Sequence, residues 1–348
     1  MFRWRPLQTP LQAFDRSFQW QPRILHRTVQ HRWYRFGGPH RGPQYRYFRQ
    51  HAGQRITNWI QGPTFFRDAT LISLGAGGIY LWNLEEVPIS GRRRFNIISP
   101  GFEAYIAQKT MKEIMQEYRG RFLPEWDPRV QQVRRVLYRL LPYVRDAGGL
   151  QDVDWEVHVI DSPEMNAFVI PGGKVFFFTG ILPMCRTEDG IAAVMAHEIA
   201  HVVAHHTAEK LSRAPFILMG VLLLYMVDVS FTMGTALMNL FLEYPGSRKQ
   251  EEEADFIGLL MMAEGCYRPE AAAELWARMD RLEAARGERT PEILTTHPSH
   301  GRREAKIREW LPKAYEKREH SDCGNIMGFV RRRKRLLHHL QLRLVFLL

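Results

Sequence analysis

Apolar and polar residues follow the periods of helices and strands along much of this chain. Four stretches carry apolar residues at helical spacing with polar residues on the other face: 102–118, 130–144, 270–285 and 302–310. This spacing predicts amphipathic helices that each pack one face on a core. Residues 155–160 alternate between apolar and polar positions, which predicts a strand.

Two short apolar runs, 167–170 and 174–178, flank the turn sequence Pro171-Gly172-Gly173. Runs of this length around a glycine-rich turn predict a β-hairpin. The edge of a hairpin can hold an extended peptide by strand addition, through main-chain hydrogen bonds. A sheet with a purely structural role is the alternative. The candidate substrate-binding residues on this edge are Asn166, Ala167, Phe168 and Val169.

Two longer apolar stretches raise the question of a membrane. Residues 69–82 are uncharged with aromatic residues at their edges, and we expect 65–84 to form one membrane anchor, although a span needs about 20 apolar residues. Residues 214–242 are strongly apolar but contain Asp228, and a charge in the centre of a bilayer is unfavourable. We expect a buried helical pair there, with a hairpin that dips into the membrane face and a true span as alternatives.

The charge of the chain is concentrated at its N-terminus. The 348 residues are 45% hydrophobic, enough for one large core, and have a formal net charge of +11. Residues 1–67 contain many arginines, no lysine and one acid, Asp15. This composition is typical of a mitochondrial transit peptide, which we assign with the following basic segment to residues 1–64. Because the excess is terminal and no binding module follows it, no nucleic-acid partner is expected.

The sequence His197-Glu198-Ile199-Ala200-His201 is the candidate catalytic motif. Helix-forming flanks, with Thr187 as N-cap, predict that it puts two imidazoles one turn apart with a carboxylate beside them. Two neutral imidazoles hold Zn²⁺, and the glutamate can act as general base toward a water molecule. A histidine ten positions after the first would indicate a metzincin, but Thr207 stands there.

A catalytic zinc needs a third protein ligand, and Glu251 is the candidate. Glu251 and Asp255 are four residues apart, so on a helix Glu251 can ligate the metal while Asp255 accepts the outer N–H of a ligating imidazole. The alternative is an acidic, solvated first turn after Ser247-Arg248-Lys249. Given the upstream motif, we predict one zinc ion held by His197, His201 and Glu251.

His205 also follows the motif by one turn. Three successive residues at this spacing progress along the helix axis, so a third imidazole does not easily join the same tetrahedral site. We expect a supporting or surface role for His205. The cysteines are Cys185, Cys266 and Cys323. A disulfide between the last two is one alternative, and unpaired thiols are the slightly favoured expectation.

Four motifs in this order resemble one family: HEIAH at 197–201, EEEAD at 251–255, Thr296-His297-Pro298-Ser299 with Arg303, and 166–174. Over about residues 85–325 the chain resembles the gluzincin membrane peptidases related to the CAAX prenyl proteases, and most of all their mitochondrial Oma-type branch. The resemblance implies that Glu198 is the general base. It also implies that His297 stabilises the transition state near the scissile carbonyl and that Arg303 supports it.

We therefore expect an α+β, predominantly helical fold. Its main part is a zincin-like (gluzincin) peptidase domain with a small β-sheet beside the HExxH helix, preceded by the membrane anchor. The expected division is 1–64 transit peptide and basic segment, 65–84 anchor, 85–100 linker, 101–325 zinc metallopeptidase domain and 326–348 basic and apolar tail.

The resemblance further implies a location and a class of substrate. It implies a metalloendopeptidase of the mitochondrial inner membrane, facing the intermembrane space, which cleaves membrane-anchored proteins beside the lipid bilayer in quality control and stress. Assembly into a homo-oligomer stays open. One alternative is a CAAX-type prenyl-protein protease, which the Arg-rich N-terminus disfavours. Another is a non-catalytic zinc scaffold that binds unfolded membrane proteins, which the intact Glu198 disfavours.

Overall fold

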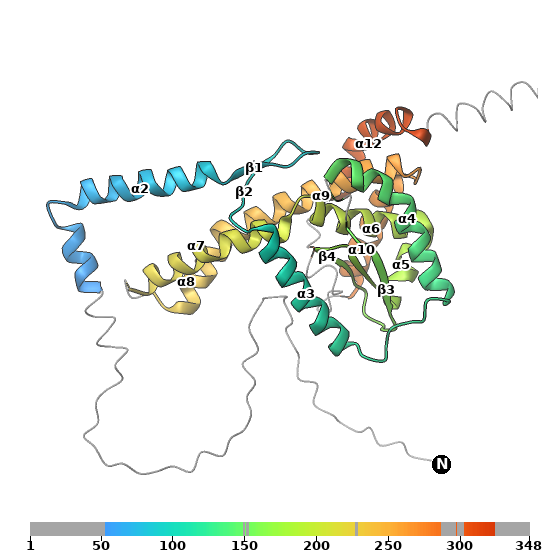
Figure 1. Cartoon of the computed structure of the whole chain (residues 1–348), viewed down its shortest axis with the longest axis horizontal. Coiled ribbons are helices and arrows are strands. Elements are labelled where there is room, and N and C mark those ends of the chain that lie inside the picture. Colours follow the sequence, from blue (N-terminus) through green and yellow to red (C-terminus); the bar gives the residue numbers. More distant parts are fainter. Residues whose placement is uncertain are drawn as a thin grey trace, which may run out of the picture.

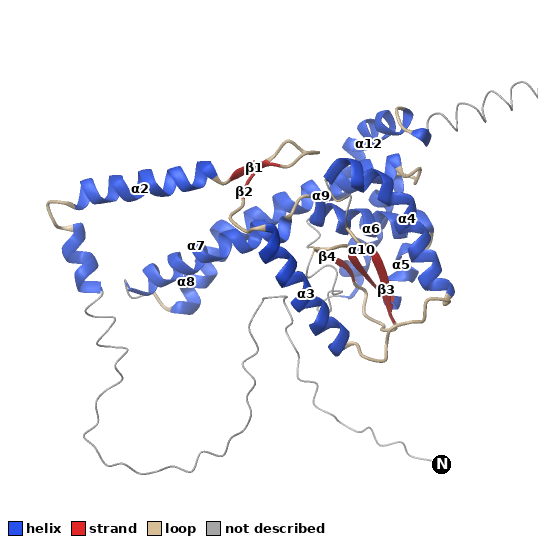
Figure 2. Cartoon of the chain, viewed as in Figure 1, coloured by secondary structure: helices blue, strands red, loops and turns tan. Residues whose placement is uncertain are grey.

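A computed structural model describes residues 53–148, 150, 153–226, 229–286, 297 and 303–323. This part of the chain is predominantly helical with two small sheets, as predicted (Figure 2). The helices are 53–60, α2 (Phe65–Trp82), α3 (Pro100–Glu117), α4 (Pro128–Gly148), α5 (Leu182–Cys185), α6 (Glu188–Val203), α7 (His206–Met226), α8 (Phe231–Met238), α9 (Tyr244–Glu264), α10 (Glu270–Arg286) and α12 (Arg303–Glu319). The strands are β1 (Leu84–Glu86), β2 (Arg93–Phe95), β3 (Glu156–Ile160), β4 (Ala167–Ile170) and β5 (Lys174–Phe178). Most of the predicted transit peptide and the tail 326–348 lie outside the described residues.

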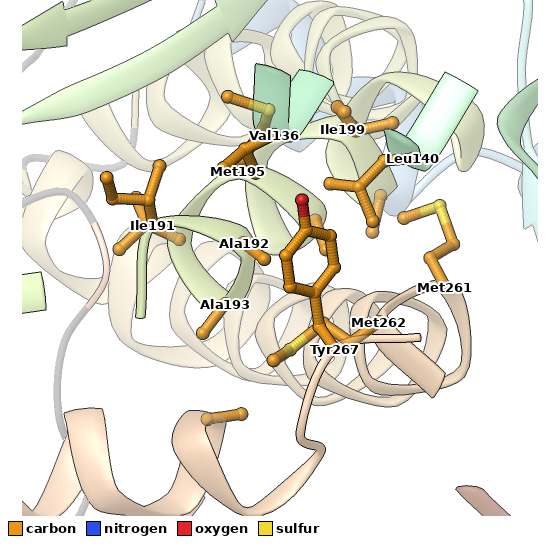
Figure 3. Packing of buried hydrophobic residues seen from close by; sticks show 14 of the residues in the cluster. Val136, Leu140, Ile191, Ala192, Ala193, Met195, Ile199, Met261, Met262 and Tyr267 are labelled. Carbon is orange, nitrogen blue, oxygen red and sulfur yellow. The ribbon is translucent and has the colours of Figure 1, made fainter. Parts of the chain in front are cut away.

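The core is built around α6, which is buried along nearly its whole length. The helices α4, α9 and α10 pack on it, and Figure 3 shows side chains of α4, α6 and α9 meeting around Tyr267. The helices α6 and α9 come into backbone contact at Gly258, where an added Cβ would lie 2.9 Å from the backbone nitrogen of His197. Glycine at position 258 therefore allows α9 to approach the HExxH helix closely, because a larger side chain would collide with the backbone of α6.

The strands β3, β4 and β5 form one three-stranded sheet beside α6, in the order β3-β5-β4. The strand β3 runs parallel to β5, and β4 pairs antiparallel with β5, with Ala167 opposite Phe177. Gly172 and Gly173 have positive φ angles of 86° and 78° in the connecting turn, so the predicted hairpin is confirmed. Its strand β4 is one of the two edge strands of the described sheet and contacts α6.

Residues 84–95, most of them in the expected linker, instead form a hairpin of β1 and β2 between α2 and the body of the protein. Phe95 is buried and stacks on Tyr80 of α2, and it makes an edge-to-face contact with Phe216 of α7. The guanidinium of Arg94 is also buried, and it donates to the carbonyl of Ala204. The hairpin is therefore packed structure, because its arginines find partners on the peptidase body.

The helices α2, α7 and α8, which we call the peripheral helices, extend away from the body (Figure 1). None of the helices described is both long and apolar enough to cross a membrane. The helix α2 coincides with the predicted anchor and has no buried residue. The expected buried pair at 214–242 is wrong: α7 and α8 do pack on each other, but most of their large apolar side chains are exposed. Asp228 lies outside the described residues.

A disulfide joins Cys266, just after α9, to Cys323, just after α12. The favoured expectation of unpaired thiols is therefore wrong for these two residues. Cys185 is free and buried, and burial raises the pKa of its thiol to about 12. The disulfide ties together two helices that both supply residues to the site described next. The helix α12 is also longer than predicted, since it continues through Pro312 to Glu319.

Candidate metal centre

The helix α6 presents both histidines of the HExxH motif on one face. Thr187 caps it as predicted, because its side chain accepts a hydrogen bond from the backbone of Gly190. His197 is buried and His201 nearly so, and their Nε2 atoms lie 3.1 Å apart. Both imidazoles therefore direct the same nitrogen toward one point, as the spacing predicted.

Glu251 reaches the same point from α9. One of its carboxylate oxygens lies 3.3 Å from Nε2 of His197, and the other lies 3.5 Å from Nε2 of His201. The helix begins at Tyr244, so Glu251 lies two turns inside it and is only 2% exposed. The alternative of a solvated first helical turn is therefore wrong.

These three groups fit a zinc ion. Ligand atoms about 2.0–2.2 Å from a tetrahedral metal lie about 3.2–3.6 Å from one another. The two Nε2 atoms are 3.1 Å apart, and the two oxygens of Glu251 lie 3.3 Å from His197 and 3.5 Å from His201 respectively, which is close to this range. Oε1 of Glu251 is buried and has no hydrogen-bond partner among the described residues. A buried carboxylate oxygen without a donor is unfavourable unless a cation compensates it. Two imidazoles and one carboxylate are also a donor set that zinc prefers.

His297 adds a fourth group to this cluster. Its Nδ1 lies 2.9 Å from Oε2 of Glu251 and 3.3 Å from Nε2 of His197. His197, His201, Glu251 and His297 together form the group of potential ligands in the described chain, with one atom of each lying within 4.8 Å of the others. His297 is therefore part of the same cluster and lies against Glu251 and His197.

Asp255 and Arg303 lie behind His197. Oδ1 of Asp255 is 3.0 Å from Nδ1 of His197, the nitrogen that points away from the centre. Arg303 forms two hydrogen bonds of 2.6 and 2.7 Å with the carboxylate of Asp255, and its guanidinium lies 3.4 Å from the ring centre of Trp276. Although burial opposes ionisation of Asp255, the charge of Arg303 lowers its pKa. This carboxylate can therefore accept the Nδ1–H of His197 while Nε2 stays free for a metal.

Glu198 points into the same buried space. It is 3% exposed, and its Oε1 has no hydrogen-bond partner among the described residues, although Nε2 of His297 is 3.3 Å away. Burial raises the pKa of this carboxyl group, which makes it a better proton acceptor when it is ionised. A basic, unpaired carboxylate next to a metal cluster has the properties that proton transfer requires.

The four candidate substrate-binding residues lie at the edge strand. Asn166 precedes β4, and its backbone carbonyl accepts a hydrogen bond from Phe178 on β5. Its side-chain oxygen Oδ1 is buried and has no partner among the described residues. Ala167, Phe168 and Val169 belong to β4 itself, which has β5 on one side only within the described sheet. The backbone groups on the other side of β4 can pair with a further extended segment.

Sequence reasoning missed the role of His206. The helix α6 ends at Val203, and His205 has a positive φ of 48°, so the chain turns before α7 begins. His205 consequently reaches Glu103 on α3, at 3.0 Å, and its side chain is 32% exposed, which fits the surface role rather than the supporting role among those expected. His206 instead lies with its Nδ1 2.7 Å from Nδ1 of His201. Counting along one continuous helix pointed to His205 as the histidine nearest to His201, and it failed because the helix ends between them.

Three further charged residues surround His206. Oε2 of Glu253 lies 2.8 Å from Nε2 of His206, and Arg92 contacts both Glu253 and Glu209 at 2.7 Å. Although burial opposes ionisation of Glu253, hydrogen bonds from His206, Arg92 and Ser90 lower its pKa to about 2. An indication was present in the acidic run 251–253 and the arginines 92–94, but which of them meet depends on the hairpin and the helix break.

Comparison with known proteins agrees with this geometry. Residues 128–311 match the family model described as peptidase family M48. The chain is 46% identical over 280 residues to the mitochondrial metalloendopeptidase OMA1 of Schizosaccharomyces pombe, covering 80% of this chain and 79% of the relative. For the protein of the same name from Saccharomyces cerevisiae the identity is 38% over 266 residues, 73% of this chain and 77% of the relative. The human metalloendopeptidase OMA1 is 33% identical over 256 residues, 70% of this chain and 49% of the relative. The resemblance and the zinc cofactor predicted from the motifs are confirmed, and the chain belongs to peptidase family M48.

Proposed function

We propose that this zinc peptidase is an endopeptidase of the mitochondrial inner membrane that cleaves membrane-anchored proteins in quality control and under stress. The similar metalloendopeptidases are mitochondrial by name, which supports the activity and the compartment. The observation that carries the proposal is the buried cluster of two Nε2 atoms and one carboxylate with Glu198 at its side.

In this proposal His197, His201 and Glu251 hold the zinc ion. A zinc ion bound there would supply Lewis acidity toward a peptide carbonyl and a water molecule. Glu198 accepts the proton that the attacking water releases and delivers it to the amine that leaves. Its buried position and raised pKa support both steps, because the carboxylate competes well for a proton there.

His297 serves as the stabiliser of the developing oxyanion. Its imidazole stands beside the ligand Glu251 and 3.3 Å from Glu198, so a ring N–H can donate to the reacting carbonyl oxygen. Asp255 orients His197 by accepting its Nδ1–H, and Arg303 holds Asp255 in place through two short hydrogen bonds. Arg303 also donates to the backbone carbonyl of His297 at 3.5 Å, which links both sides of the centre.

The substrate lies along β4 as an additional strand. Main-chain hydrogen bonds to Ala167, Phe168 and Val169 bind an extended peptide with little side-chain selectivity. The unpartnered Oδ1 of Asn166 is an acceptor for one peptide N–H at the end of that strand. The contact of β4 with α6 brings the bound peptide past the HExxH motif.

The peripheral helices meet the lipid bilayer, with the peptidase domain on the intermembrane-space side. In α2, Leu74 is 68% exposed and Trp82 is 90% exposed; in α7, Met219 is 59% exposed. Exposed apolar surface of this extent marks contact with a membrane or another protein. In this arrangement α2 is the anchor and the pair α7–α8 dips into the membrane face, which holds the metal centre near membrane-anchored substrates.

A comparison of three forms of the full-length, detergent-solubilised protein tests the proposal. These are the wild type, Glu198→Gln and the control Glu252→Gln, which alters an exposed carboxylate paired with Lys306. We expect all three to hold zinc and to fold, and Glu198→Gln to cleave a membrane-tethered protein about 10²- to 10⁴-fold more slowly. Unchanged cleavage by Glu198→Gln would refute the mechanism. Zinc binding without cleavage by any form would favour a scaffold.

A further inference from the structure

The nitrogen of His201 that points away from the metal cluster has His206 as its hydrogen-bond partner. Its Nε2 faces the metal cluster, 3.1 Å from Nε2 of His197, so in the ligating form the hydrogen must be on Nδ1. That Nδ1 lies only 2.7 Å from Nδ1 of His206, which leaves room for a single hydrogen. His206 must therefore accept at Nδ1 and carry its own hydrogen on Nε2.

Glu253 favours this tautomer of His206. Its Oε2 lies 2.8 Å from Nε2 of His206, and an ionised carboxylate can only accept a hydrogen bond. A lone pair on Nε2 would face this negative charge, whereas an N–H on Nε2 is stabilised by it. The hydrogen position on His206 therefore fixes the hydrogen position on His201 as well.

Arg92 and Ser90 hold the carboxylate of Glu253 in place. Its Nη2 atom lies 2.7 Å from carboxylate oxygens of both Glu253 and Glu209, and its Nε donates to Glu253 at 2.8 Å. Ser90 of the same turn donates to the other oxygen of Glu253. The guanidinium stands between two carboxylates that would otherwise repel each other, so it fixes the position of Glu253. The turn between β1 and β2, which carries Ser90 and Arg92, is therefore the far end of the hydrogen-bonded chain that begins at His201.

We propose that His206 is a positioning residue for the zinc ligand His201, and that Glu253 and Arg92 hold it in the tautomer that leaves Nε2 of His201 free for the metal. The inference rests on the zinc site of the proposed function and extends it to the hairpin before α3. It gives the two ligating imidazoles equivalent support. Behind His197 stand a carboxylate and Arg303, and behind His201 stand an imidazole, a carboxylate and Arg92.

Four variants of the full-length, detergent-solubilised protein test this role by zinc affinity, measured in competition with a chromophoric chelator. His206→Ala removes the acceptor, and we expect zinc affinity to fall about 10- to 100-fold. His206→Asn keeps an oxygen where Nδ1 stood and should remain within about threefold of the wild type. His206→Gln places its amide near the former position of Nε2, facing Glu253 instead of His201. Its zinc affinity should therefore fall as far as that of His206→Ala. The control His205→Asn changes the neighbouring histidine, which bonds Glu103, and should have wild-type affinity.

The Co²⁺-substituted protein gives a second readout. The visible absorption of Co²⁺ reports the geometry of its ligands, so His206→Ala and His206→Gln should alter the spectrum while His206→Asn and His205→Asn should not. A purely structural role would not separate asparagine from glutamine, so equal zinc affinities and spectra for these two overturn the inference. If one of them does not fold, Glu253→Gln decides: an affinity and spectrum like those of the wild type likewise overturn it.

The same measurements distinguish this inference from the proposed function. A wild-type protein that binds no zinc contradicts the zinc site itself. A wild type that binds zinc, with His206→Ala folded and equally tight, contradicts only the role of His206.

Discussion

The metal centre and the peripheral helices distribute polar and apolar groups in opposite ways. Around the centre, charged side chains are buried: Glu251 is 2% exposed, and Asp255 and Arg303 are each 6% exposed. In α2 and α7 the exposed groups are apolar, with Trp82 at 90% and Phe216 at 53%. Buried charges persist only where partners compensate them, and exposed apolar surface persists where something other than water meets it.

The comparison indicates where the protein is sensitive to change. At the centre each charged group depends on its neighbours, so the loss of one leaves another buried and unpaired. On the peripheral helices, side chains that face outward contribute little to folding. We therefore expect a substitution at the centre to impair zinc binding or folding strongly, and a substitution of similar size on the peripheral helices to change folding little.

Glu251→Gln should have the largest effect. The change removes the charged ligand while keeping the shape of the side chain, so we expect zinc affinity to fall by roughly a thousandfold or more and proteolysis to be lost with it. Metal content after gel filtration and chelator competition measure this. The control Glu252→Gln alters the adjacent, exposed residue and should bind zinc normally. Normal zinc binding by Glu251→Gln would show that the third ligand is another residue.

The disulfide next to the centre should give the next largest effect. Cys266 and Cys323 are 57 residues apart, and closing a loop of this length stabilises a protein by about 4 kcal/mol in the chain-entropy model. Cys323→Ser should lower the free energy of unfolding by about this amount, measured by urea denaturation. Reductant should lower the free energy of unfolding of the wild type by the same amount and should leave that of the variant unchanged.

Two further observations check the pairing. The double variant Cys266→Ser, Cys323→Ser should be no less stable than either single variant, because one bond is lost in each case. If reductant leaves the stability and the electrophoretic mobility of the wild type unchanged, the two thiols do not pair in the protein.

His297→Ala should slow proteolysis without removing zinc. Loss of one group that stabilises an oxyanion lowers kcat by about 10²- to 10³-fold. Zinc content should stay near that of the wild type, because His197, His201 and Glu251 remain. In the structure Nδ1 of His297 stands 2.9 Å from Oε2 of Glu251 and 3.3 Å from Nε2 of His197. A faster enzyme after the substitution would mean that this imidazole obstructs the centre rather than assists it.

The parts of the site that local sequence determines were the parts that could be predicted. The spacing of His197 and His201 on a capped helix fixes their common face, and the spacing of Glu251 and Asp255 does the same on α9. The two helices can meet because Gly258 allows their backbones to come close, and no local pattern in the sequence indicates this contact.

The parts that depend on a break or on long-range contacts could not be predicted. The positive φ at His205 interrupts the helical period, so His206 rather than His205 reaches His201. The partners of Arg92 lie on α7 and α9, more than 100 residues along the chain. Hydropathy likewise predicted burial at 214–242, because apolar composition alone does not distinguish a core helix from one whose side chains face outward.

The smallest effect on folding, and the sharpest test of the comparison, is expected on α7. Leu218 and Leu222 are one turn apart and are 52% and 43% exposed, whereas Val221 of the same helix is 2% exposed. Changing both leucines to serine should alter the free energy of unfolding by less than about 0.5 kcal/mol per site, since neither side chain leaves a cavity. Val221→Ser should lower it by about 2 kcal/mol, because it removes buried methyl groups and buries a hydroxyl.

Binding to vesicles should show the reverse order. If the outward face of α7 enters a bilayer, the two leucines contribute apolar area to that contact, and their loss should weaken binding to vesicles that contain anionic lipid by about tenfold or more. Val221→Ser should bind vesicles normally as long as it is folded, because its side chain faces α8. If the double leucine variant is as unstable as Val221→Ser, the outward face of α7 packs against protein in solution. The exposed apolar surface proposed for α7 would then be wrong.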